Sequence, residues 1–71
     1  MATVRISTAP HAHAPRQWVG APVIDRQNRI ERSLDIPEAA YQGIEAAIGQ
    51  GSLEGEITLA DGQRFHWLLD R

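Results

Sequence analysis

Histidine and carboxylate side chains are the residues of this sequence with the widest chemical scope. His66 and Glu56 are expected to face each other across a hairpin, and a histidine beside a carboxylate can act as a general acid or base. The sequence places no serine or cysteine nucleophile beside this pair and contains no glycine-rich phosphate loop. We therefore interpret the pair as a cross-strand charged contact, and we predict no catalytic residues and a non-enzymatic protein.

A second histidine pair, His11 and His13, lies in the segment between Pro10 and Pro15. Two histidines can share a metal ion, but the chain has no cysteine, and a third ligand would have to come from His66 or a distant carboxylate. Without a fixed scaffold such a site is costly in conformational entropy. We predict no metal site and no cofactor.

Size and charge favour a binding protein. The 71 residues form one predicted domain, 1–71, and a domain this small buries only about 60% of its unfolded surface. The chain has no cysteine and hence no disulfide, so we predict that it forms a homodimer. Residues 1–34 carry a net charge of +3 and residues 35–71 a net charge of −5, a division that favours self-association or docking onto a charged partner.

The first half of the chain has the pattern of extended structure. The predicted segments are a strand at 2–8, a Pro/His loop at 9–15 and a strand-turn-strand unit at 16–34. Pro22 interrupts the first strand of that unit, which indicates an edge strand or a bulge. Asn28 suits a left-handed turn position, and residues 29–34 are expected to return as a third strand.

A helix is predicted over 35–50. Asp35 and Glu38 have the spacing of a capping box, and Pro37 suits the first turn. Apolar residues recur at helical spacing at Ile36, Ala40, Ile44, Ala47 and Ile48. Gly43 is expected to pack closely against the sheet, and Gly51 to take the left-handed conformation that ends the helix.

The last predicted unit is a hairpin over 53–69. A three-residue loop, 60–62, with Gly62 in the left-handed position pairs Ile57 with Phe65 and Gly55 with Trp67. This register collects the apolar side chains on one face and allows the Trp67 ring to cover Gly55. The opposite face then carries Glu54, Glu56, Thr58, Arg64, His66 and Leu68.

Together these elements predict an α+β fold. The expected order is β-β-β-α-β-β, with a small antiparallel sheet of four to five strands and one helix on its apolar face. The sequence has no signal peptide pattern and no apolar stretch long enough for a membrane span, so we expect a cytoplasmic protein that does not enter a membrane.

The function we predict is binding to another protein. In size and layout the chain resembles small accessory proteins of phages and mobile elements, including anti-CRISPR-type inhibitors, which occupy a functional surface of a host protein. Tryptophan is enriched at such contacts, and Trp18 lies on the interrupted strand. The residues predicted to contact a host protein are Trp18, Glu54, Glu56, Arg64 and His66.

An alternative function is DNA binding. The segments Ile24-Asp25-Arg26-Gln27-Asn28-Arg29-Ile30, Ile36-Pro37-Glu38 and Leu53-Glu54-Gly55-Glu56 together resemble the AbrB/SpoVT family of swapped-hairpin DNA-binding dimers. The resemblance covers about half of the chain. Asn28 stands where that pattern has a turn glycine, and residues 31–35 are extra. It implies a transcriptional regulator or antitoxin in which Arg26, Arg29 and Arg32 face nucleic acid.

Overall fold

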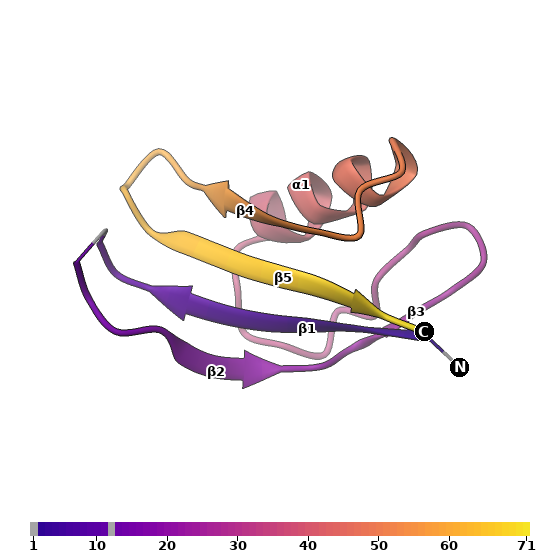
Figure 1. The fold of residues 1–71 in the computed structure, drawn as a ribbon, viewed down its shortest axis with the longest axis horizontal. Coiled ribbons are helices and arrows are strands. Elements are labelled where there is room, and N and C mark those ends of the chain that lie inside the picture. Colours follow the sequence, from indigo (N-terminus) through magenta and orange to yellow (C-terminus); the bar gives the residue numbers. More distant parts are fainter. Residues whose placement is uncertain (1, 12) are drawn as a thin grey trace.

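The first and last strands of the chain form the centre of the sheet. The computed structural model describes residues 2–11 and 13–71. Its elements are β1 (Ala2–Ala9), β2 (Gln17–Gly20), β3 (Val23–Ile24), α1 (Glu38–Gly49), β4 (Glu54–Thr58) and β5 (Arg64–Asp70). The sheet order is β2-β1-β5-β4, β3 also pairs with β1, and every pairing is antiparallel (Figure 1). The predicted α+β class and the order β-β-β-α-β-β are confirmed.

Alternation along β1 separates two faces of the sheet. Val4 and Ile6 are fully buried, whereas Arg5 between them is exposed. Their neighbours on β5 follow the same pattern, because Ile6 pairs with Trp67 and Arg5 pairs with Leu68. One face of the sheet is therefore apolar and the other mixed, as expected for a sheet covered on one side.

Pro22 divides the predicted second strand into β2 and β3. Both pieces lie along the same edge of β1, and the Val4 N–H donates to the Pro22 carbonyl between them at 2.9 Å. Since proline has no N–H to donate, this edge position is the one its chemistry allows. The predicted strand at 29–34 is wrong: only an isolated bridge joins Ile30 to Ile24, so the third strand of the fold is β3.

The helix begins later than predicted and ends as predicted. It starts at Glu38 with Pro37 as its N-cap residue and without a side-chain cap, so the predicted Asp35–Glu38 capping box is wrong. At the other end Gly51 has φ +96° and donates to the Ile48 carbonyl, while Ser52 donates to the Ala47 carbonyl. These two bonds form a Schellman motif.

The closing hairpin has the predicted register. Gly62 has φ +90°, the Leu59 N–H donates to the Gln63 carbonyl at 2.9 Å, and Gly55 pairs with Trp67. A Cβ added to Gly55 would lie 3.1 Å from Nε1 of Trp67 and 3.3 Å from two ring carbons. The tryptophan ring therefore rests directly on the glycine backbone, and this close approach needs a residue without a side chain.

The core lies between the sheet and the covering elements. The helix contacts β4 and β5, and the segment 25–37 covers the side of the sheet nearer β1. The buried cluster contains Val4, Ile6, Ile24, Ile30, Ala40, Tyr41, Ile44, Ile48, Phe65 and Trp67. In Figure 1 the helix lies behind the sheet, and the opposite face is turned toward the viewer. No helix in the described part of the chain is long and apolar enough to cross a membrane.

Candidate functional site

The face of the sheet opposite the helix is the candidate site, and we call it the open face. Strand register arranges its side chains in rows. One row contains Arg5, Leu68 and Glu54, the next contains Trp18, Ser7, His66 and Glu56, and a third contains Arg64 and Thr58. The predicted protein-binding residues Trp18, Glu54, Glu56, Arg64 and His66 are thus brought to one surface. Arg5 also belongs to this surface and was not among the predicted residues.

Trp18 is the most exposed large apolar residue of this face. Its relative exposure is 61%, and its only aromatic or cation contact in the described residues is with Arg5, whose guanidinium carbon lies 5.5 Å from the ring centroid. This cation–π contact stabilises the ring position by about 0.5–1 kcal/mol at an exposed site. Because the ring stays largely in water, it is available to a partner.

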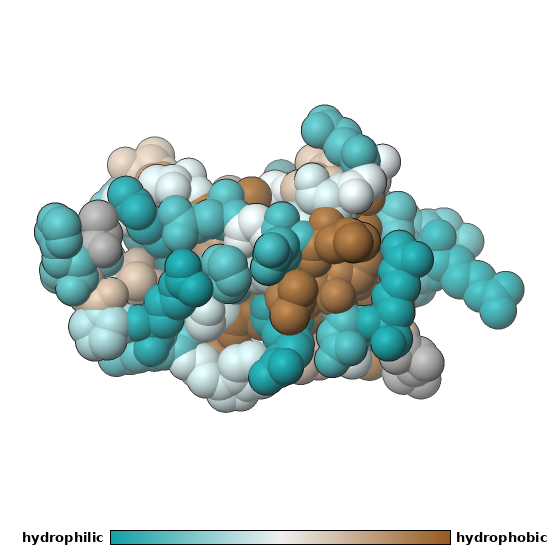
Figure 2. Space-filling model, in the orientation of Figure 1, coloured by the Kyte–Doolittle hydropathy of each residue, from teal (hydrophilic) through white to brown (hydrophobic). Residues whose placement is uncertain are grey.

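Leucine side chains add an apolar area to the same half of the molecule. Leu68 lies on the open face with 38% of its surface exposed, and Leu53, at the residue before β4, is 59% exposed. Figure 2 shows an apolar area toward the C-terminal end of β5, bordered by hydrophilic side chains. An exposed apolar area with a polar border is typical of a protein-binding surface.

The charges on β4 and β5 are partly paired. Nη1 of Arg64 lies 3.5 Å from Oε1 of Glu56, and both side chains are more than a third exposed. Exposed pairs of this kind contribute between about 0 and 1 kcal/mol to stability. In the described ranges no ion pair joins His66 to Glu56, although the two residues are opposite each other in the register. These side chains therefore make the surface charged, but they do not hold it rigid.

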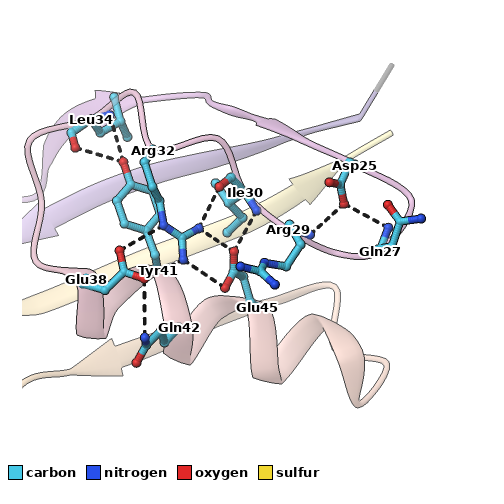
Figure 3. Close-up of polar contacts among 10 residues, drawn as sticks. All are labelled: Asp25, Gln27, Arg29, Ile30, Arg32, Leu34, Glu38, Tyr41, Gln42 and Glu45. Atoms are coloured by element: carbon cyan, nitrogen blue, oxygen red, sulfur yellow. Dashed lines mark hydrogen bonds and ion pairs between the residues drawn. The ribbon is translucent and has the colours of Figure 1, made fainter.

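The three arginines of the DNA-binding alternative have different surroundings. Arg26 and Arg29 are exposed in the turn after β3. Arg32 instead reaches the helix: its Nε and Nη2 donate to the Glu38 carboxylate at 3.0 and 2.7 Å, and its Nη1 donates to the Glu45 carboxylate (Figure 3). A guanidinium whose donors are used in this way is a poor phosphate ligand. Arg26 and Arg29 therefore remain as candidate contacts for nucleic acid.

We call Arg32, Glu38, Tyr41 and Glu45 the loop clamp. The Arg32 guanidinium carbon lies 4.4 Å from the centroid of the Tyr41 ring, and its Nη1 also donates to the Ile30 carbonyl at 2.7 Å. Beside it, the Tyr41 hydroxyl accepts from the Leu34 N–H at 2.8 Å and donates to the Leu34 carbonyl at 2.9 Å (Figure 3). These contacts hold the segment 25–37 over the core.

Hydrogen bonds in the loop clamp shift the pKa values of Arg32, Glu38 and Glu45. Hydrogen bonds from Arg32 lower the pKa of the Glu38 and Glu45 carboxyl groups, and the backbone N–H of Ile30 lowers that of Glu45 further. Burial of Glu45 opposes this shift but does not cancel it. In turn, hydrogen bonds to Glu45 and Glu38 raise the pKa of Arg32. All three side chains are therefore charged at neutral pH.

Acidification should destabilise the fold through these two carboxylates. A carboxyl group whose pKa is lowered by folding stabilises the native state above its unfolded pKa, and this contribution is lost as pH falls through the folded value. We expect the free energy of unfolding, measured by urea titration, to decrease between about pH 5 and pH 3. Glu45→Gln should show a smaller decrease over that range, and an equal decrease in both proteins would contradict this assignment.

The turn that carries Arg26 and Arg29 is held by Asp25. Its Oδ1 accepts from the backbone N–H groups of Gln27 and Arg29, each at 2.9 Å, and Asn28 takes the expected left-handed conformation with φ 63°. An open depression of about 740 Å³ lies next to this turn. It is lined by Ala2, Val23, Ile24, Asp25, Arg26, Asn28, Leu69 and Arg71.

The predicted absence of a metal site concerns His11 and His13 in the loop after β1. Within residues 2–11 and 13–71, no three His, Cys, Asp or Glu side chains lie close enough together to hold a metal ion. Nδ1 of His11 accepts from the His13 backbone N–H at 3.3 Å. This is a local loop contact.

No protein-family model, curated protein or solved structure matches this chain. The resemblance to the AbrB/SpoVT family therefore depends on its short motifs alone.

Proposed function

We propose that this chain is a protein-binding module that contacts a host protein through its open face. The observation that supports the proposal best is the 61% exposure of Trp18 on a sheet face that no described helix covers. Burying an aromatic ring of this size at an interface can contribute several times as much as a typical contact. Leu68 extends the apolar surface, and both residues lie among charged side chains.

The charged side chains would orient the partner. Glu54, Glu56, Arg64 and His66 lie around the apolar residues, where a polar rim contributes to specificity and to the association rate more than to affinity. A module of this kind would act by covering a functional surface of the host protein. Inhibition of that protein in the cytoplasm, in the manner of anti-CRISPR-type proteins, is the activity that we propose.

Replacing Trp18 by alanine should weaken partner binding by about tenfold or more, as expected for an interface hot spot. The partner is first captured from host lysate with the wild-type chain as bait, in the presence of nuclease and at high salt. Its dissociation constants with wild type and Trp18→Ala are then compared by calorimetry. Arg26→Ala is the matched control, because Arg26 is exposed away from the open face. Equal affinities for wild type and Trp18→Ala would refute the role of the open face.

The second candidate function is nucleic-acid binding by the turn after β3. Two exposed arginines, Arg26 and Arg29, favour it. Phosphate contacts make affinity fall steeply with salt, so retention should disappear with nuclease or at high salt. Under this function the double substitution Arg26→Ala and Arg29→Ala abolishes retention, whereas Trp18→Ala leaves it unchanged.

A further inference from the structure

We infer that the open face also binds a second copy of this chain, with β4 of each copy lying over β2 of the other. This inference rests on the proposed function, since it assigns one partner to the same face. In the absence of a host protein the chain would then be a symmetric dimer whose interface is a face-to-face packing of two sheets. A host protein that binds the open face would have to displace the second copy.

Charges of opposite sign lie on the two sides of the open face. Arg5 and Trp18 lie on the β1 and β2 side, and Glu54 and Glu56 lie on the β4 side. Glu56 meets Arg64 within the chain, whereas in the described residues neither Arg5 nor Glu54 forms an ion pair. The β1 and β2 side of the face therefore carries an arginine that is available for an ion pair, and the β4 side carries a carboxylate that is available for one.

A twofold axis that runs parallel to the strands, between β1 and β5, would bring these opposite charges together. Rotation about such an axis places β4 of one copy over β2 of the other and β5 over β1. Arg5 then lies over Leu68 of the second copy, and Glu54 of the second copy is its next neighbour in the same row. Symmetry produces each contact twice. Packed sheets lie about 10 Å apart, a gap that an arginine and a glutamate can bridge together.

The other arrangements bring like charges together. An in-plane axis perpendicular to the strands would place β4 over β4, with Glu54 and Glu56 facing the same residues of the second copy. Edge-to-edge antiparallel pairing of the two β4 strands would also set these acids against each other. Repulsion disfavours both arrangements, so charge selects the axis parallel to the strands.

The open face would become the dimer interface. The molecule measures 34 × 20 × 19 Å, and the strands that carry the open face run along its longest dimension in Figure 1. A stable interface of standard size takes about 800 Å² from each partner, so most of this face would have to be covered. Covering it would bury Trp18 and Leu68, the exposed apolar residues of the face.

The test is a charge exchange followed by sedimentation equilibrium. Arg5→Glu and Glu54→Arg should each raise the dimer dissociation constant by about tenfold or more, and the double variant should recover most of the wild-type affinity. Arg26→Glu and Glu31→Arg are the matched controls, because they reverse exposed charges in the segment on the other side of the sheet and should leave dimerisation unchanged. Circular dichroism confirms folding, which exposed substitutions should preserve. As a second readout, the wild-type dissociation constant should rise with ionic strength.

Two results would overturn the inference. The first is a wild-type chain that stays monomeric up to millimolar concentration, and the second is a dimer that the charge reversals do not weaken or the double variant does not restore. A monomer that still captures a host protein through Trp18 would refute the dimer and leave the proposed function intact. A dimer that obeys the charge exchange and captures nothing would support the inference and remove the host-protein part of the proposal.

Discussion

Gly55→Val should lower the free energy of unfolding by about 3 kcal/mol, at the upper end of the cost of overpacking a core. The Gly55 backbone supports the Trp67 ring so closely that even a Cβ atom would lie 3.1 Å from Nε1. Trp67 is 1% exposed and packed against the central cluster, so it cannot move away without disturbing the core. The two added methyl groups of valine make the overlap severe.

Alanine provides a graded comparison for this prediction. Gly55→Ala should cost about 1 kcal/mol, because only one atom is added to the contact. Gly49→Ala is the matched control: nothing lies within 4 Å of its added Cβ, and alanine is the better helix former, so stability should stay the same or increase. Urea titrations of the three variants measure the differences. Equal stabilities for wild type and Gly55→Val would refute the close approach.

Removal of the Arg32 guanidinium, the second large effect, should lower the free energy of unfolding by about 2 kcal/mol. This value lies between those of exposed and buried ion pairs, since the side chain is 32% exposed. Arg32→Ala removes the hydrogen bonds to Glu38, Glu45 and the Ile30 carbonyl and the contact with the Tyr41 ring. Glu45, whose side chain is only 14% exposed, then keeps its charge without its cation.

Two comparisons separate the loop clamp from general charge effects. Arg26→Ala removes the same charge from an exposed turn and should change stability by less than about 0.5 kcal/mol. Arg32→Lys keeps the charge but loses the forked geometry that joins two carboxylates, so an intermediate loss is expected. If Arg32→Ala and Arg26→Ala were equally stable by urea titration, the clamp would have no energetic role.

The closing hairpin could be predicted from the sequence because its determinants are local. Gly62 fixes the turn, and a shift by one residue would have sent Ile57 and Phe65 to opposite faces. The end of the helix at Gly51 could also be predicted from the sequence, since few other residues accept a φ of +96°. In both places the residues that determine the conformation are close neighbours in the chain.

The start of the helix could not be predicted because a longer-range contact competes with the local one. The sequence offers Glu38 as a capping-box partner for Asp35, but the Glu38 carboxylate binds Arg32 instead. A charged, forked contact is stronger than a capping hydrogen bond. Two further contacts with the helix account for the missing strand at 29–34, because Arg32 binds Glu45 and Leu34 binds Tyr41 rather than a neighbouring strand.

The open face was predicted in part. The alternation of the hairpin places Glu54, Glu56, Arg64 and His66 on one side, and the pairs in the structure confirm this register. That Arg5 joins them depends on the pairing of β1 with β5, which connects residues more than fifty positions apart. No local sequence pattern specifies this pairing, so the position of Arg5 on the open face could not be predicted from the sequence.

The central position of β1 and β5 has a consequence for the synthesis of this protein. Among the strands of this sheet β1 leaves the ribosome before the others, whereas its long partner β5 leaves after them, and the ends of the described chain lie side by side in Figure 1. Until β5 emerges, Val4 and Ile6 lack Leu69 and Trp67 opposite them, and the nascent chain must keep these apolar residues from aggregating. The sheet therefore closes only after β5 has been translated, in a step slowed by the large sequence separation between its two central strands.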